Sequence, residues 1–119
     1  MKLVILICAY FSKGIWSIDF HNSGKEILSS SSSGVCKLWD PKSGKATTKL
    51  SAHKGSAFWA SYSEGGDHIA TGGMDKMVYL WDRRKAKKPV FKCIGNRSIV
   101  RSVGFLNGDS LIVSTSLEG

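Results

Sequence analysis

His53, Thr71 and Asp75 are the residues whose types match a hydrolytic triad, since together they supply a base, a hydroxyl and a carboxylate. In such a triad the Thr71 hydroxyl would be the nucleophile and would have to meet substrate at an exposed turn. The sequence has no Gly-x-Ser-x-Gly turn, and Thr71 lies in a segment typical of a strand. We therefore predict no catalytic residue and a structural role for this trio.

Metal and cofactor chemistry finds little support in the sequence. His21 and His68 lie at turns without Cys, Asp or Glu at ligand spacing, so we predict no metal site. No glycine-rich phosphate-binding motif is present either. We accordingly predict no cofactor.

A basic run is made up of Arg83, Arg84, Lys85, Lys87 and Lys88. Such a run is typical of a nuclear-localisation signal or a nucleic-acid patch, but a solvated loop is the commoner outcome. No aromatic residue interrupts the run, which disfavours stacking on bases. Contact with phosphate is therefore the one mode of nucleic-acid binding that we expect of it.

The composition is that of a globular chain of 119 residues, with 42% hydrophobic and 10% aromatic residues. Seventeen Lys and Arg against nine Asp and Glu give a net charge of +8, which favours acidic partners, nucleic acid or an anionic surface. Three cysteines at no metal-like spacing favour a reduced chain, and we expect a cytoplasmic or nuclear location.

The segment from Leu3 to Phe11 is apolar or aromatic throughout and follows a single basic residue, Lys2. It is too short for a membrane-spanning helix, and no small-x-small cleavage site of a secretory signal is evident near Cys8. Residues 3–7 are rich in strand-forming side chains. We expect a strand here, and no membrane association.

An internal repeat organises the chain. Residues 35–40 (VCKLWD) return as residues 77–82 (MVYLWD), with an interval of 42 residues from Trp39 to Trp81. The segments upstream repeat at the same offset, residues 26–29 as 68–71 and residues 16–20 as 58–62. A third copy begins at Arg101 and carries no Trp-Asp pair.

Each copy consists of short alternating segments separated by polar turns. Ile18 and Phe20 alternate with polar residues in the first copy, as Val103 and Phe105 alternate with small residues in the third. No segment shows a sustained period of 3.6 residues, which would indicate a helix. The sequence therefore predicts an all-β architecture with almost no helix.

This pattern resembles the WD-repeat β-propeller family, whose repeats of about 40–45 residues form four-stranded blades and close on Trp-Asp. The resemblance covers about residues 12–119. It implies antiparallel four-stranded blades in an incomplete propeller ring. The implied parts are a possible outer strand of a preceding blade (1–11), a first repeat (12–52), a second repeat (53–94) and a truncated third repeat (95–119).

The resemblance also implies a buried tetrad of His, Ser or Thr, Asp and Trp in a blade. The middle repeat has His53, Thr71, Asp75 and Trp81 at these positions. Asp75 should accept from His53 and nearby backbone N–H groups, and Thr71 should link His53 to the Trp81 indole. No buried donor is then left unpaired.

The flanking repeats depart from the tetrad pattern. In the first repeat, Phe11 and Ser33 stand at the His and Asp positions, and in the third repeat Asn96 and Glu118 do. These repeats should depend mainly on apolar packing. The expected core residues are Ile15, Ile18, Phe20, Ile27 and Leu38 in the first and Val100, Val103, Phe105 and Ile112 in the third.

Propellers normally close with about four to eight blades, and this chain supplies two and part of a third. We expect a fragment, a truncated product or one part of an assembly that completes the ring. Open sheet edges and bare blade faces should make the isolated chain marginally stable and prone to self-association.

The family resemblance places partner binding on the top face of the ring. The matching positions are Trp16, Phe58, Arg101, Ser32, Met74 and Leu117. Trp16, Phe58, Met74 and Arg101 form the predicted binding patch, because aromatic, Arg and Met side chains dominate interface energetics. For each aromatic residue, packing between blades is an equal alternative.

We predict a non-catalytic scaffold or adaptor that binds a protein or peptide partner. One alternative is a ribonucleoprotein or chromatin-associated propeller that contacts phosphate through the basic run, with nucleic acid as the second choice of partner. Another is a fragment with no independent function. A hydrolase based on His53, Thr71 and Asp75 comes last.

Overall fold

Short strands separated by turns make up the part of the chain that the structure describes. The computed structural model describes residues 14–107 and 111–116, and in these it has ten strands and one 3₁₀ turn. The predicted all-β class is confirmed. Alternating β-branched, aromatic and polar residues form these strands because one face of each can be buried while turn residues end it.

The strands form three antiparallel sheets, two of them four-stranded and one two-stranded. The first contains β1 (Ile15–Phe20), β2 (Ile27–Ser31), β3 (Val35–Asp40) and β4 (Lys45–Ser51), hydrogen-bonded in chain order. The second contains β5 (Ala57–Tyr62), β6 (His68–Gly73), β7 (Val78–Asp82) and β8 (Phe91–Cys93), with the 3₁₀ turn η1 (Arg83–Lys85) after β7. The third contains β9 (Val100–Leu106) and β10 (Leu111–Ser116).

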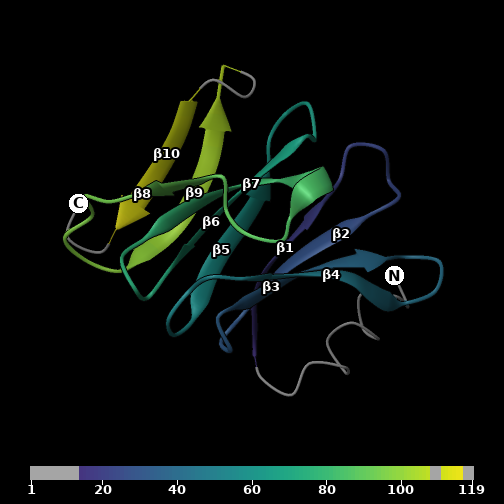
Figure 1. The fold of residues 1–119 in the computed structure, drawn as a ribbon, viewed down its shortest axis with the longest axis horizontal. Helices are drawn as coiled ribbons and strands as arrows, with labels where there is room; N and C mark the ends of the chain where they lie inside the picture. The colour runs from purple at the N-terminus through teal and green to yellow at the C-terminus, as the bar shows by residue number, and fades with distance from the viewer. Residues whose placement is uncertain (1–13, 108–110, 117–119) are drawn as a thin grey trace.

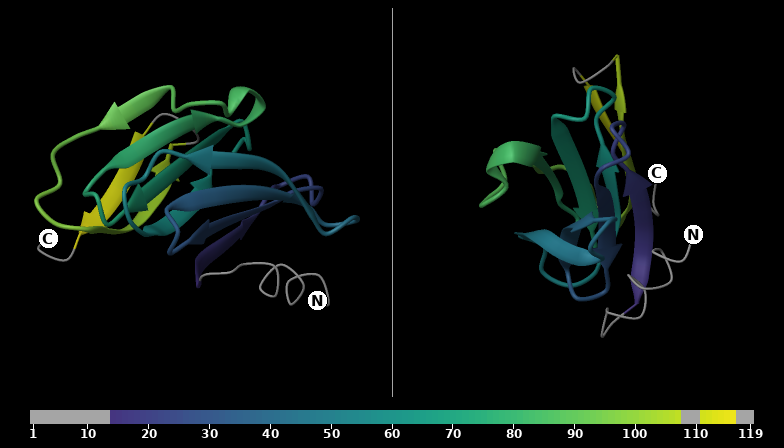
Figure 2. Two further views of the ribbon diagram at one scale, coloured as in Figure 1. Left: turned by 60° about the horizontal axis from the view of Figure 1, so that its bottom comes forward. Right: turned by 90° about the vertical axis from the view of Figure 1, so that its right-hand side faces the viewer.

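The sheets follow one another through space in chain order, like successive blades (Figure 1). Strand β5 is central, because it packs against β1 and β2 on one side and against β9 on the other. Figure 2 shows the sheets splayed and twisted relative to one another, in an open arc and not a closed ring. This is the incomplete propeller geometry that the repeat predicted.

An apolar core lies between the first two sheets. Its buried members are Leu28, Cys36, Leu38 and Leu50 from the first sheet and Ala57, Ala60, Tyr62, Ile69, Trp81 and Ala86 from the second. A second cluster joins the second and third sheets through Ala70, Val78, Val100 and Val103, with Phe105 and Ile112 packed against it. Burial of these faces is what holds neighbouring sheets together.

The prediction that Phe20 belongs to the core was wrong, since its side chain is 59% exposed. Ser17 and Asp19 point toward the second sheet, where the Ser17 hydroxyl accepts from the Ala60 N–H (3.1 Å) and the Asp19 carboxylate accepts from the Tyr62 N–H (2.9 Å). Side chains alternate along a strand, so Phe20 at the end of β1 lies on the opposite face.

The turn between β2 and β3 passes very close to the second repeat, which requires a glycine. Gly34 has a φ of +87°, and a Cβ on it would lie 2.5 Å from the carbonyl oxygen of Gly55 and 2.9 Å from that of His53. Only a residue without a side chain fits both the left-handed backbone and this approach.

Several predicted positions lie outside the described residues. They are the N-terminal strand (residues 1–11), Phe11 at the first His position, Leu117 and Glu118. Of the cysteines in the described part, Cys36 and Cys93 are free thiols, and burial raises the pKa of Cys36 to about 12.

Replacement of Gly72 by alanine tests the packing of the second sheet on the third. A Cβ on Gly72 would lie 2.5 Å from Val100 Cγ1 and 3.0 Å from Val103 Cγ1, and these branched side chains have no flexible end that could move aside. We expect Gly72→Ala to lower the free energy of unfolding by about 1–3 kcal/mol in urea titrations.

Gly104→Ala is the matched control, because a Cβ at this position would have nothing within 4 Å of it and Gly104 also lies in a strand. This change should be neutral or slightly stabilising. Equal stability of both variants would contradict the close contact between β6 and β9.

Candidate functional site

Four polar side chains of the second blade form a continuous hydrogen-bonded chain. Asp75 carries a carboxylate that can only accept, so His53 Nδ1 donates to it at 2.9 Å. His53 Nε2 then accepts from the Thr71 hydroxyl at 2.8 Å, and Thr71 Oγ1 in turn accepts from the Trp81 indole N–H at 3.0 Å. The structure thus brings together all four residues of the predicted tetrad.

The tetrad also orders the β6–β7 turn. The two oxygens of Asp75 accept from the backbone N–H groups of Lys54 (3.1 Å) and Met77 (3.3 Å). Trp81 and Thr71 are fully buried, and so is the His53 side chain. A buried Thr71 hydroxyl that is already paired twice cannot meet a substrate, which disfavours the hydrolytic interpretation of this trio.

Burial lowers the pKa of His53 below its ordinary value of 6.5, against the opposing hydrogen bond and charge of Asp75. In the neutral ring Nδ1 donates to Asp75 and Nε2 accepts from the Thr71 hydroxyl, so both ring nitrogens are paired without a second proton. The fold therefore holds His53 in its neutral form.

Among the described residues, the first blade keeps only the last link of this chain. The Trp39 indole N–H donates to the Ser29 hydroxyl at 2.9 Å, as its counterpart does to Thr71. Ser33, at the Asp position, accepts from the Val35 N–H at 3.3 Å. In the third blade the Ser114 hydroxyl lies 3.4 Å from Asn96 Oδ1. The complete set occurs in the second blade alone among the described residues.

Three β-bulges recur at the same place in the innermost strands β1, β5 and β9. Ile15 and Ser17 pair with the consecutive residues Ser31 and Ser30, which leaves Trp16 without a paired residue on β2. The register skips Phe58 in β5 and Arg101 in β9 in the same way. A bulge re-aims the side chain of its extra residue. Three predicted patch residues are thus turned out of their sheets by one recurring device.

Trp16 and Arg101 each contact Phe58, and these three residues are called the bulge row below. The Trp16 and Phe58 rings meet edge to face at 5.2 Å between centroids, and the Arg101 guanidinium lies 5.4 Å from the Phe58 centroid. Trp16 is 52% exposed, Arg101 is also exposed, and Phe58 is only 8% exposed. Phe58 therefore packs between blades and supports its two neighbours, in line with the alternative prediction for the aromatic residues.

Met74 lies at the same end of the second blade. It directly follows Gly73, which pairs with Ala57 at the start of β5, and its side chain is 49% exposed. Ser32 is half-buried, and its carbonyl accepts from the Ser56 hydroxyl at 3.3 Å. The exposed anchors at this end are thus Trp16, Met74 and Arg101.

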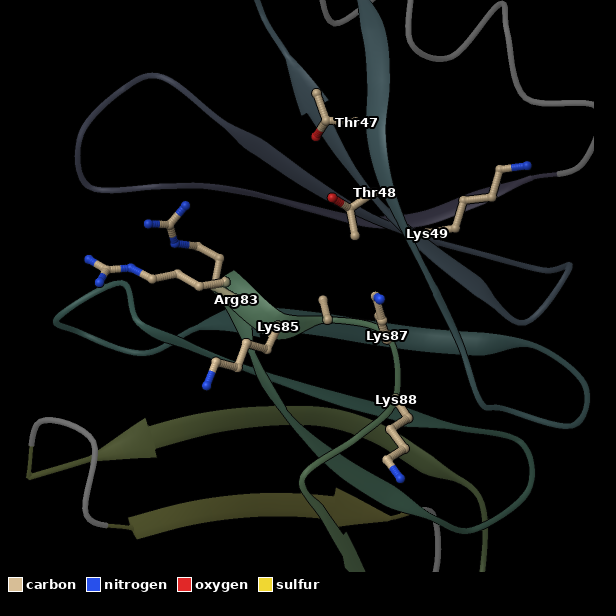
Figure 3. Close-up of a pocket in the computed structure, with 9 residues that line it drawn as sticks. Thr47, Thr48, Lys49, Arg83, Lys85, Lys87 and Lys88 are labelled. Carbon is tan, nitrogen blue, oxygen red and sulfur yellow. The ribbon is translucent and has the colours of Figure 1, made fainter.

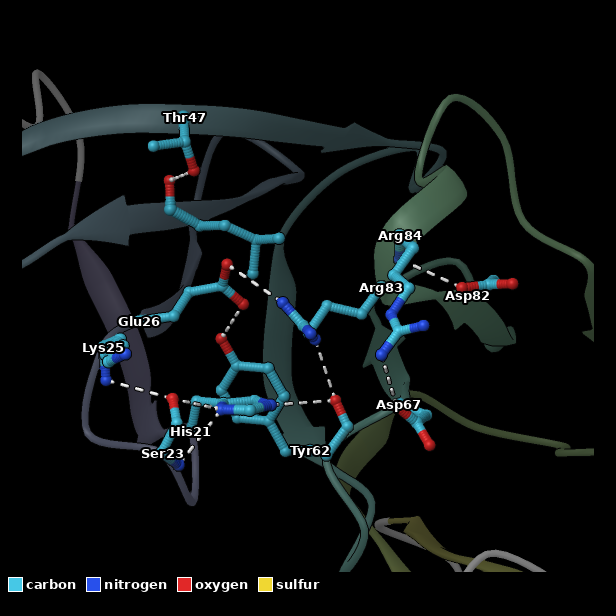
Figure 4. A network of polar contacts seen from close by, with 12 residues as sticks. His21, Ser23, Lys25, Glu26, Thr47, Tyr62, Asp67, Asp82, Arg83 and Arg84 are labelled. Atoms are coloured by element: carbon cyan, nitrogen blue, oxygen red, sulfur yellow. Dashed lines mark hydrogen bonds and ion pairs between the residues drawn. The ribbon is translucent and has the colours of Figure 1, made fainter.

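The basic run lies at the opposite end of the second blade, because Asp82, which precedes it, pairs with His68 at the far end of β6. Figure 4 shows the polar contacts that the Arg83 side chain makes at this end of the blade. Its Nε donates to the Gly66 carbonyl at 2.9 Å, and its Nη1 lies 3.6 Å from Glu26 of the first blade. Arg83 thus connects the first and second blades through polar contacts.

The same network includes Tyr62, whose hydroxyl donates to Glu26 at 2.8 Å, and His21, whose Nε2 donates to the Gly66 carbonyl at 3.0 Å (Figure 4). Burial and the Glu26 carboxylate raise the pKa of Tyr62, so it remains a donor. The sequence did not indicate this cluster, because its members come from separate turns and strands. The one signal for it in the sequence was a pair of opposite charges, with Glu26 in the first repeat and Arg83 in the second.

Within residues 14–107 and 111–116, no group of three His, Cys, Asp or Glu side chains is placed to hold a metal ion. The same part of the chain has no helix that is long and apolar enough to cross a membrane.

Antiparallel sheets that are stacked face to face in chain order, each beginning at an inner strand, define the blades of a β-propeller. Comparison with protein families gives the same class. The family model described as "WD domain, G-beta repeat" matches residues 3–40 and 44–82. The chain belongs to this WD40 repeat family.

Similar proteins include Protein SPA1-RELATED 4 of Arabidopsis thaliana, which is 30% identical over 87% of this chain. The ribosome biogenesis protein WDR12 homolog of Ixodes scapularis is 29% identical over 85% of the chain. Pre-mRNA-processing factor 19 of Oryza sativa subsp. japonica is 35% identical over 63% of it. The chain spans 13%, 25% and 14% of the length of these relatives, respectively.

Removal of the Thr71 hydroxyl tests whether the tetrad stabilises the second blade. Thr71→Val keeps the shape of the side chain but leaves both the Trp81 N–H and His53 Nε2 without partners. Each buried group left unpaired costs about 1–3 kcal/mol. Ser29→Ala in the first blade is the comparison, because it removes a hydroxyl that accepts from the Trp39 N–H and is not linked to a histidine among the described residues. We expect the larger loss of unfolding free energy for Thr71→Val, and an equal loss would contradict cooperation through His53.

The lowered pKa of His53 predicts a pH dependence of stability. The unfolded chain takes up a proton near pH 6.5 and the folded chain only at lower pH, so the unfolded state binds more protons in between. The contribution of neutral His53 is complete above this range and is lost as pH falls toward the lowered pKa. Urea midpoints measured from about pH 7 to pH 5 should fall more steeply in the wild type than in His53→Gln. Parallel curves would show that another group is responsible.

Proposed function

We propose that this chain is part of a non-catalytic scaffold whose partner-binding surface contains the bulge row and Met74. The observation that carries the proposal is the recurrence of one bulge in three neighbouring strands. It lines up Trp16, Phe58 and Arg101 across three blades, although they are far apart in the sequence. Protein–protein interfaces are enriched in these residue types.

The geometry of the row suits a hot spot. Phe58 forms a buried platform, and Trp16 and Arg101 pack on it with much of their surface still open to solvent. A partner would find both side chains already ordered, so little conformational entropy would be lost on binding. Pre-ordered aromatic and Arg anchors are those that dominate measured interfaces.

The charge at this end indicates the chemistry of the partner. Arg101, Lys54 and Lys76 are exposed there, whereas the Asp75 carboxylate is occupied by His53 and by backbone N–H groups. Trp16 and Met74 supply apolar contact. A peptide segment that combines an apolar anchor with one or two carboxylates fits this surface best.

We further propose a nuclear or cytoplasmic location. The names of two relatives refer to ribosome biogenesis and to pre-mRNA processing, and these names support the proposal without identifying a partner. Further blades or a second copy of the chain would extend the surface beyond the three inner strands.

A displayed peptide library tests the proposal. Peptides selected on the full chain should contain acidic and apolar residues, and calorimetry should show a drop in affinity of about tenfold or more for Trp16→Ala and for Arg101→Ala. Trp59→Ala and Arg97→Ala are matched controls, since both residues are exposed and lie outside the bulge row. Controls that weaken binding as much as the row variants, or a selection that yields no binder, would refute the assignment.

A further inference from the structure

A groove of about 730 Å³ lies between strand β4 of the first blade and the loop after β7 of the second (Figure 3). Six cationic side chains line it, together with the hydroxyl-bearing Thr47 and Thr48. Ala86 is its one apolar lining residue, and no carboxylate lines it. Lys49 lines the groove from β4 on the side opposite the basic run, and its ammonium points away from the loop (Figure 3). The sequence alone did not connect Lys49 with the basic run.

The basic wall of the groove is held in place. Ala86 is 8% exposed and belongs to the apolar core between the first two blades. Its burial fixes the position of the middle of the loop. At the start of the loop, Asp82 Oδ1 accepts from the Arg84 N–H at 3.0 Å, and Arg83 is held by Glu26 and the Gly66 carbonyl. The lysines on either side of Ala86 therefore project from an ordered backbone.

The cations of the groove fall into two groups. Arg83 is partly neutralised by Glu26, and exposed Arg84 lies 3.9 Å from Asp67. The four lysines of the groove are all exposed, and none forms an ion pair with a described carboxylate; they are Lys49, Lys85, Lys87 and Lys88. Their charges are thus available to a ligand, while the arginines mainly shape the loop.

The lining indicates the class of ligand. Protein–protein interfaces need apolar and aromatic anchors, and a single alanine methyl supplies none. Interfaces with nucleic acid are more polar and far more positive. No aromatic ring lines the groove, so bases have nothing to stack on and only the backbone can be held.

We propose that this groove binds the sugar–phosphate backbone of a nucleic-acid strand, with Lys49, Lys85, Lys87 and Lys88 as its phosphate contacts. Contacts of this kind position a strand without reading its sequence. The groove is separate from the bulge row, so this assignment does not depend on the proposed protein-binding surface.

Salt dependence of binding to a labelled oligouridylate tests the assignment on the full chain. Release of counterions gives a slope of log K against log salt of about −0.7 for each phosphate contact on a single strand, or about −3 for four lysines. By the same relation, each lysine contributes about fourfold to affinity at 0.15 M salt. Oligothymidylate should bind equally well, because no contact to a 2′-hydroxyl is assigned.

Lys49→Gln is the decisive variant, because Lys49 is the one lysine of the groove that comes from the first blade, and its flexible side chain can turn toward a bound strand. We expect about a fourfold loss of affinity and a slope that is less steep by about 0.7. Lys45→Gln on the same strand is the control, since Lys45 is also exposed but does not line the groove. Equal effects of the two variants would overturn the role of the groove, because the affinity would then come from the net positive charge of the chain.

The loop is tested by replacing Lys85, Lys87 and Lys88 together by glutamine, for which we expect about a fifty-fold loss at 0.15 M salt. A triple variant of Lys25, Lys42 and Lys92 lowers the net charge equally at exposed positions outside the groove and should lose much less. Thermal unfolding checks that both variants remain folded. Tighter binding of a polyglutamate peptide than of the oligonucleotide, or no binding of the oligonucleotide, would overturn the proposal.

Discussion

The sheets of this chain have apolar faces that are stable only when a neighbouring sheet covers them, and the rest of the structure depends on that burial. Leu28, Leu38 and Leu50 of the first blade meet Ile69 and Trp81 of the second in one continuous core. Each blade exposes its own face to the next, so no single blade contains a complete core. Stability is therefore a property of pairs of neighbours, as in other repeat proteins.

Polar side chains supplement this apolar contact in two ways. Inside the second blade the tetrad pairs the Trp81 indole, so a large ring can be buried without an unsatisfied donor. Between blades, Ser17 and Asp19 accept from the backbone of β5, whose N–H groups would otherwise face an edge without a partner strand. The network around Glu26 and Arg83 likewise joins the two blades, at the end opposite Met74.

The surfaces available for binding are consequences of the same packing. The bulge row exists because three inner strands lie side by side, and the basic groove exists because the rims of two blades face each other. They differ in chemistry, since one offers aromatic and apolar anchors and the other offers lysines. The antiparallel register places Met74 and the basic run at opposite ends of the second blade, so occupation of one surface leaves the other free.

The sequence by itself determined the repeat, the all-β class and the identity of the tetrad in the second blade. These follow from strand alternation, turn residues and a spacing of 42 residues, all of which can be read along the chain. Only the tertiary structure decided that Phe58 is a buried platform, that Phe20 is exposed and that Lys49 lines one groove together with the basic run. Burial and proximity of this kind depend on which neighbouring sheet covers a face and on where a bulge turns a side chain. Neither is encoded in the local pattern of residues.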